Sequence, residues 1–353
     1  MMHNINLNSK TGKYSFFSTR KTAWHGLGQV VQDYPTSEEA MQFAGLDYQV
    51  DKIPVFAHWD NPDAGGSPQE LIPVPDHFAT VRTDTGQAFG VVGKDYQVVQ
   101  NTEAFAFFDE IVGGGEGILY ETAGALGNGE RVFITAKLPG YIRVGGGDDI
   151  TEKYIFLTTS HDGSGSITAA FTPIRIVCHN TLNAAMRNKT NVVRIRHTTN
   201  AAQRLKDAHK VMGLANTFGQ ELETLFNQWA QVRIKDEEVK QLIRMAMCPN
   251  KETWQALEKG EEDKLSTTYK NTCDQVFSYA MIAESQQMQT TKGTVFGAYN
   301  AVTGYYQNVR NFKDDNAKVK SIYLGGTAQN RGQKAFDLCN AFVQHGAAAL
   351  NMN

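Results

Sequence analysis

The chain has 353 residues, of which 41% are hydrophobic and 20% are charged, and its formal net charge is −3. This length exceeds what one compact core usually needs, so we expect one large domain or two interleaved domains. The composition is that of a globular protein, and the absence of a run of about 18 apolar residues predicts a protein that does not span a membrane.

The N-terminal segment carries no sign of a secretory signal, because no basic stretch is followed by an apolar run and a cleavage site. We therefore expect the protein in the cytoplasm. Trp24 and His25 precede Gly26 and Gly28, two glycines that permit a tight backbone path around them. This corner is either a functional site or a packed turn.

A short helix of about ten residues is predicted after Thr36, and it continues through Ala40 to Ala44. Thr36 and Glu39 have the spacing of a capping box, and Gly45 is a natural stop for the helix.

Strands and one further helix are expected between this helix and residue 113. The segment 61–76 is rich in proline and glycine, and we predict a surface loop there. Asn101 is positioned to cap the second helix, which we expect to end at Gly113. The predicted strands are 48–57, 78–82 and 88–99.

Residues 117–177 have the pattern of an antiparallel meander. Segments rich in β-branched and aromatic residues alternate with turn signals, of which the clearest is His161-Asp162-Gly163. This turn should fold one strand back on the next. The predicted strands are 117–124, 131–138, 153–160 and 166–177.

The positive charge of the chain is concentrated at residues 171–210. Residues 1–170 contain 21 acidic and 11 basic residues, whereas residues 171–210 contain eight basic residues and one acidic residue. Such a basic stretch in a near-neutral protein is typical of a surface that binds a polyanion, and nucleic acid is the polyanion we expect. The alternative is a solvated face whose partners lie in the acidic half.

Within this basic stretch the pattern predicts a strand between two helices. Asn180 or Thr181 is positioned to cap a helix at 182–188, and a longer helix begins near residue 200. Between them, residues 191–198 alternate, so that Arg194 and Arg196 lie on one face of a half-buried strand.

After residue 212 the apolar residues recur at helical spacing almost throughout. We therefore predict an α+β protein with an antiparallel sheet-rich N-terminal half and a mostly helical C-terminal half. The expected division places an α+β domain at 1–200. A helical region at 201–353 packs on it or mediates self-association.

The four cysteines are widely spaced and form no C-x-x-C pair, which argues against a zinc ribbon or a thioredoxin-type centre. We expect neither a metal nor a cofactor. Cys178 is the one thiol of interest, because it stands near Arg175 at a strand-to-helix corner where a thiolate would be stabilised. A purely structural role for Cys178 is the alternative.

Five motifs in order resemble the phage/plasmid-like protein family, which is known as domain of unknown function 932. They are A-W-H-G-L-G at 23–28, V-V-G-K-D-Y-Q-V-V-Q-N-T-E at 91–103, S-H-D-G-S at 160–164, R-I-V-C-H-N-T-L at 175–182 and G-A-Y-N-A-V-T-G-Y at 297–305. The resemblance implies a bacteriophage, prophage or plasmid gene whose product acts in the cytoplasm of the bacterial host. It implies no chemistry.

We predict a protein that binds or anneals single-stranded DNA in phage recombination or replication, as a homo-oligomer. Three strands followed by a helix are similar to the core of the single-strand annealing proteins, and a row of bases would neutralise phosphates. Tyr154, Phe156 and Phe171 are either base-stacking faces or core residues. The predicted nucleic-acid-binding residues are Arg175, Arg187, Lys189, Arg194, Arg196, Lys206 and Lys210.

Two other functions remain open. One is a module that binds and modulates a host or defence protein. The other is an enzyme that uses His25 and Cys178, although no spacing of histidines and acids suggests a metal site. The motif residues to which we assign no role are Trp24, His25, His161, Cys178, Asn180 and Asn300.

Overall fold

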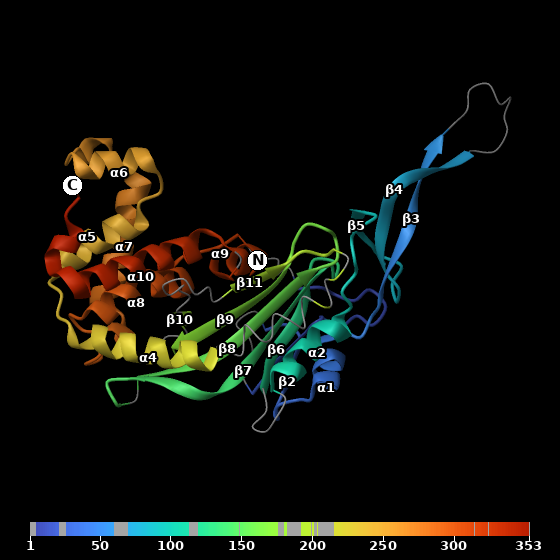
Figure 1. Cartoon of the computed structure of the whole chain (residues 1–353), viewed down its shortest axis with the longest axis horizontal. Helices are drawn as coiled ribbons and strands as arrows, with labels where there is room; N and C mark the ends of the chain where they lie inside the picture. Colours follow the sequence, from blue (N-terminus) through green and yellow to red (C-terminus); the bar gives the residue numbers. More distant parts are fainter. Residues whose placement is uncertain are drawn as a thin grey trace. The chain divides into compact units, whose positions relative to one another are not determined.

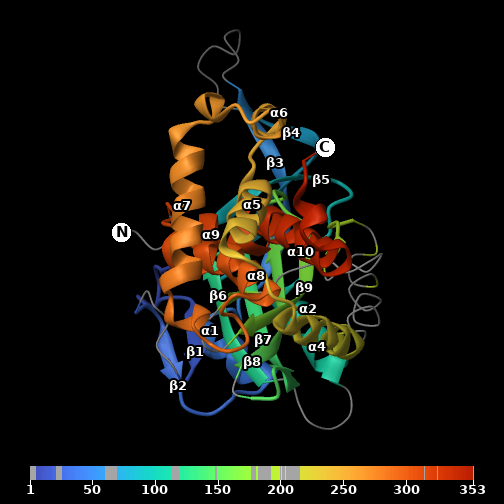
Figure 2. The same ribbon diagram turned by 90° about the vertical axis from the view of Figure 1, so that its left-hand side faces the viewer.

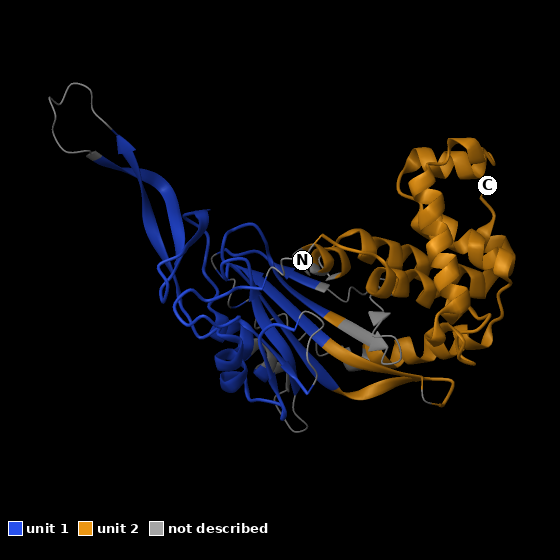
Figure 3. Cartoon of the chain, turned by 180° about the vertical axis from the view of Figure 1, so that it is seen from behind, with its two compact units in different colours: residues 1–138, 155–170, 192–213 blue, residues 139–154, 171–191, 214–353 orange. Residues whose placement is uncertain are grey.

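The computed structural model describes residues 5–20, 26–59, 70–112, 119–147, 149–175, 180–181, 192–198, 200, 203, 215–313, 315–323 and 325–352. Sheets occupy the N-terminal half and helices mostly the C-terminal half, so the predicted α+β class is confirmed (Figure 1). The chain divides into two compact units. Unit 1 consists of residues 1–138, 155–170 and 192–213, and unit 2 of residues 139–154, 171–191 and 214–353 (Figure 3).

The strands of the larger sheet follow the order β10-β9-β8-β7-β6-β1-β2, with β11 also paired to β9. The sequential order from β6 to β9 is the predicted meander. The bounds are β1 Phe16–Thr19, β2 Gln29–Val31, β6 Leu119–Leu126, β7 Arg131–Val144, β8 Asp149–Ser160, β9 Ile167–Arg175, β10 Asn180–Thr181 and β11 Val192–Ile195.

Strand β7 shows how the sequence pattern places the core of unit 1. From Arg131 to Leu138 every second side chain is buried, in the period-two alternation of a sheet with one covered face. Val132, Ile134 and Ala136 are fully buried. Helices α1 (Ser37–Ala44) and α2 (Asn101–Val112) also belong to this unit. The predicted capping box and the left-handed Gly45 at the ends of α1 are confirmed.

The smaller sheet has the order β3-β4-β5, with bounds β3 Val50–Trp59, β4 Glu70–Arg82 and β5 Ala88–Gly93. The loop predicted at 61–76 is wrong in its second part, because residues 70–76 are strand. Strand β5 pairs with β4 only at residues 77–81, so the preceding part of β4 has β3 as its sole described neighbour. Proline is tolerated on such an edge, which is why Pro73 and Pro75 do not prevent a strand.

The helices of unit 2 pack around α8 (Val295–Gly304), whose ten residues are all buried (Figure 2). A helix that is buried on every side needs neighbours on every side, and α8 contacts α4, α5, α7 and α10. The bounds are α4 Ala215–Gln231, α5 Asp236–Met247, α6 Lys251–Glu258, α7 Thr267–Ile282, α9 Asp315–Tyr323 and α10 Thr327–His345, with short turns η1 Glu262–Lys264, η2 Glu284–Gln286, η3 Tyr305–Val309 and η4 Gly346–Leu350.

Candidate nucleic-acid interface

Two exposed arginines lie at the end of strand β11, Arg194 within the strand and Arg196 directly after its last residue, Ile195. The strand runs antiparallel to β9, with Arg194 opposite Thr168, and β9 is its one neighbour among the described strands. The side chains of Arg194 and Arg196 are exposed, whereas Ile195 and His197 between and after them are only 5% and 6% exposed. The predicted alternation is therefore confirmed, and the Cα atoms of the two arginines lie about 7 Å apart in extended backbone.

Neither arginine forms an ion pair within the described ranges. A guanidinium group is always charged and offers its N–H donors in a planar fork that matches phosphate oxygens. The end of β11 thus presents two positively charged donor groups that are not engaged in an ion pair with any described residue.

His197 fixes the buried face of this segment. Its Nδ1 donates to the backbone carbonyl of Gln97 at 3.1 Å, so its Nε2 accepts from the Thr159 hydroxyl at 3.2 Å. The ring of Tyr96 stacks on the imidazole with centroids 4.9 Å apart. Burial lowers the pKa of His197 below its ordinary value, so the ring is neutral and anchors the strand without contributing charge.

His161 lies close to this anchor and is fully buried. Its Nε2 is 3.0 Å from the side-chain oxygen of Asn101, whose amide nitrogen donates to the carbonyl of Leu46. His161 must therefore be the donor, and its Nδ1 is buried without a hydrogen-bond partner. Burial, with His197 nearby, lowers the pKa of His161 to about 3. The Phe89 ring stacks on this neutral imidazole with centroids 6.1 Å apart.

Asn101 does not play the predicted role of helix cap. It is the first residue of α2 and is 1% exposed, and the backbone carbonyl of Gln100 accepts from the amide of Ala104 instead. The sequence could not show this, because a capping pattern does not reveal that a distant carbonyl and an imidazole compete for the same side chain.

Three segments that are distant in the sequence thus pack together on the buried side of β11. Tyr96 stacks on His197, and its hydroxyl donates to the carbonyl of Ser160 at 2.9 Å. Tyr96 and Asn101 belong to the motif at 91–103, and Ser160 and His161 to the motif at 160–164. Residues of two of the five motifs therefore hold His197 and, with it, the segment that contains Arg194 and Arg196.

Arg175 and Asn180 lie in unit 2 and are register partners, Arg175 in β9 and Asn180 in β10. The backbone of Asn180 is therefore in a short strand, and the helix that it was expected to cap lies outside the described residues. Trp24, His25, Cys178, Arg187, Lys189, Lys206 and Lys210 also lie outside the described residues.

The three aromatic residues considered for base stacking belong to the core. Tyr154 is 6% exposed, Phe156 is 4% and Phe171 is 2%, so none presents a ring face to solvent. Asn300 is likewise fully buried in α8, where its amide donates to the carbonyl of Phe296 at 2.8 Å. The motif at 297–305 is therefore a packing motif of unit 2.

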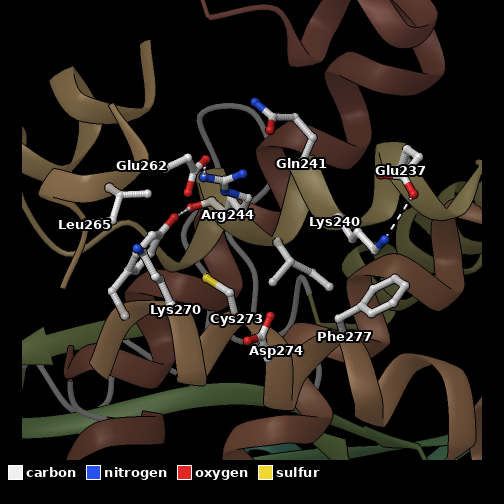
Figure 4. A pocket seen from close by; sticks show the side chains of 12 residues that line it. Glu237, Lys240, Gln241, Arg244, Glu262, Leu265, Lys270, Cys273, Asp274 and Phe277 are labelled. Carbon is white, nitrogen blue, oxygen red and sulfur yellow. Dashed lines mark hydrogen bonds and ion pairs between the residues drawn. The ribbon is translucent and has the colours of Figure 1, made fainter. Parts of the chain in front are cut away.

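Sequence reasoning missed a cavity of about 330 Å³ in unit 2, because the residues that line it have the spacing of core stripes (Figure 4). Its charged side chains include the ion pairs Arg244 with Glu262 and Lys240 with Glu237. Burial raises the pKa of Cys273 to about 11, so this thiol is protonated at neutral pH and is a poor nucleophile. The cavity is lined by Glu237, Lys240, Gln241, Ile243, Arg244, Glu262, Leu265, Tyr269, Lys270, Cys273, Asp274 and Phe277.

Within the described part of the chain, no three His, Cys, Asp or Glu side chains are grouped so that they could hold a metal ion. No helix in those same ranges combines the length and the apolar character needed to cross a membrane.

Comparison with known proteins gives one match. The model of a family described as a domain of unknown function (DUF932) matches residues 88–323, which include β11, both arginines and the supporting histidines. No curated protein and no solved structure matches the chain significantly.

Proposed function

The chain belongs to the family described as a domain of unknown function (DUF932), and we propose that it binds nucleic acid, with single-stranded DNA as the preferred ligand. The proposed setting is phage recombination or replication in the cytoplasm of a bacterial host, where the protein works as a homo-oligomer. The order of the five sequence motifs supports this setting.

The observation that carries the proposal is the pair of exposed arginines at the end of β11. Arg194 and Arg196 are exposed at the end of β11, whereas Ile195 and His197, which alternate with them, are buried. Single-stranded DNA places its phosphates next to such positively charged side chains. Binding releases the counterions that are condensed on the phosphates. The two arginines also lie within the basic stretch, residues 171–210, whose sequence contains eight basic residues and one acidic residue.

The test is fluorescence anisotropy with single-stranded and duplex DNA at several salt concentrations. For Arg194→Ala/Arg196→Ala we expect weaker binding at low salt. The slope of log K against log salt should become shallower by roughly 1.4, because each lost phosphate contact removes about 0.7 on a single strand. Equal affinity for duplex and single-stranded DNA would contradict the proposed preference for single-stranded DNA.

A matched control removes two arginines from elsewhere. Arg143 and Arg310 are exposed in unit 2, so Arg143→Ala/Arg310→Ala changes the net charge by the same amount. This control should retain the wild-type slope. If the wild type does not bind at low salt, or if both double variants weaken binding equally, β11 is not a nucleic-acid interface.

A further inference from the structure

A second cavity in unit 2, of about 590 Å³, lies where the connection between α4 and α5 meets the C-terminal end of α10. Most of the residues that line it are apolar, and three charged residues complete the lining. Sites for small molecules have this composition, because an apolar cavity supplies contact area and a few polar groups orient the ligand.

The floor of this cavity belongs to the core of unit 2. Ile234 is 5% exposed and Phe342 is 4% exposed, and Val232 and Val343 beside them are half-buried. An apolar group that fills the cavity is removed from water together with the exposed parts of these side chains. Such burial favours the binding of a ligand with an apolar body.

Two basic side chains stand beside this floor. Arg233 and Lys235 are exposed, whereas Ile234 between them is buried, in the alternation of extended backbone. Neither base forms an ion pair with any residue that the structure describes. The cavity therefore combines apolar walls with two positive charges that no described acid neutralises.

A backbone bridge holds the segment that carries both bases. The amide of Ile234 donates to the carbonyl of Gly293 at 3.2 Å, and the amide of Val295 donates to the carbonyl of Val232 at 3.0 Å. Val295 is the first residue of the buried helix α8, so the bridge is joined directly to the core of unit 2. The site is therefore preorganised, which lowers the entropic cost of binding a ligand.

The guanidinium group of Arg233 has a fixed orientation in this segment. Its Nη1 donates to the carbonyl of Lys292 at 2.8 Å. The next residue is Gly293, where an added β-carbon would lie 3.8 Å from Nη1, so the chain passes close beside the guanidinium group. A guanidinium group has five N–H donors, and the others can bind the oxygens of a carboxylate, sulfonate or phosphate group.

Glu238 is the acid among the described residues of the lining, and its carboxylate is engaged in the cap of α5. It accepts from the amide of Lys235 at 2.7 Å. The next acids of α5, Asp236 and Glu237, are not part of this lining, and Glu237 pairs with Lys240 at 3.0 Å. With two bases and one acid, the lining has a formal charge of 2 − 1 = +1.

We propose that this cavity binds a small organic anion, a molecule with an apolar body and one carboxylate, sulfonate or phosphate group. The apolar body lies against Ile234, Phe342 and Val343, and the anionic group accepts hydrogen bonds from Arg233 and Lys235. Nucleic acid is a poorer occupant, because its hydrophilic backbone would leave the apolar walls uncovered. The proposal is independent of the proposed function, whose arginines lie in unit 1.

The test uses two fluorescent probes that differ in charge. Anilinonaphthalene sulfonate has an apolar body and a sulfonate group, and phenylnaphthylamine has the same rings without the sulfonate. The fluorescence of both probes rises in an apolar site, so titration of the full chain gives a dissociation constant for each. For the wild type we expect saturable binding of the sulfonate probe, at least about tenfold tighter than that of the uncharged probe.

The variant Arg233→Ala/Lys235→Ala removes both positive charges at exposed positions. We expect it to bind the sulfonate probe at least about tenfold more weakly than the wild type, and the uncharged probe within about twofold. Unchanged binding of the uncharged probe would show that the cavity is intact and that the loss is due to charge. The matched control is Lys259→Ala/Lys320→Ala, which removes two exposed bases of unit 2 outside the cavity and should bind both probes as the wild type does.

A third variant fills the cavity. Ala347 is exposed and lines the cavity, so Ala347→Trp should weaken the binding of both probes at least about tenfold. Four results would each overturn the proposal: a wild type without saturable binding of the sulfonate probe, retained binding in Arg233→Ala/Lys235→Ala, an equal loss in the lysine control, or unchanged binding of both probes by Ala347→Trp.

A single-stranded oligonucleotide separates this site from the proposed nucleic-acid interface. We expect that it does not displace the sulfonate probe. Displacement at low salt would assign Arg233 and Lys235 to the nucleic acid and would overturn the proposal. A wild type that binds the sulfonate probe but not DNA would support the anion site and reject the proposed function.

Discussion

Gly297→Ala is expected to destabilise unit 2 by about 2 kcal/mol. A β-carbon at this position of α8 would lie only 1.9 Å from the backbone oxygen of Thr291. Thr291 has little room to move, because it is 2% exposed and its hydroxyl donates to the carbonyl of Ser285 at 3.0 Å. Overpacking of this kind costs about 3 kcal/mol, and the better helix propensity of alanine offsets about 1 kcal/mol.

The measurement is urea unfolding followed by the fluorescence of Trp229, which is fully buried against Tyr299 in the core of unit 2. The matched control is Gly147→Ala in the same unit, where nothing lies within 4 Å of the added carbon. We expect this control to remain within about 0.5 kcal/mol of the wild type. An increase in stability for Gly297→Ala would mean that the Thr291 turn moves freely, contrary to its hydrogen bonds.

Acidification is expected to destabilise unit 1 through His161. The folded protein holds the pKa of His161 at about 3, whereas the ordinary value is 6.5. Between these two values the unfolded chain binds a proton that the folded chain excludes, so stability falls as the pH falls from 6.5 toward 3. At pH 5 the loss relative to pH 7 is about 2 kcal/mol from this one group.

The measurement is urea unfolding of the wild type and of His161→Gln, each at pH 7 and at pH 5. The variant should be less stable at pH 7, because it loses the stacking with Phe89, but its loss on acidification should be smaller by about 2 kcal/mol. His58→Gln, which replaces an exposed histidine, should keep the wild-type pH dependence. An unchanged pH dependence in His161→Gln would show that the buried ring does not exclude the proton.

Local patterns predicted several elements correctly. The capping box and the glycine stop predicted a short helix after Thr36, which the structure has as α1 at Ser37–Ala44, and the alternation of residues 193–197 predicted which side chains of that segment are exposed. Both succeed for the same reason: the pattern depends on backbone geometry over a few residues, and the tertiary structure does not override it.

Other predictions failed or stayed open where a residue that is distant in the sequence determines the local structure. Prolines and glycines predicted a loop at 61–76, yet residues 70–76 belong to strand β4, because β3 pairs with residues 70–73 and again from residue 78 after a register shift. Asn101 looked like a cap and instead bonds Leu46 and His161. The sequence around residues 70–76 or around Asn101 does not specify these distant contacts.

The sequence alone determined the α+β class, the family-related motifs and the concentration of positive charge at residues 171–210, because composition and short-range periodicity are properties of the chain itself. Only the tertiary structure decided that His161 is a buried, neutral support, that Asn300 is a core residue and that the paired ends of β3 and β4 expose apolar side chains on both faces. Burial and cross-strand pairing depend on contacts between residues tens of positions apart, and a single sequence does not specify which of those contacts form.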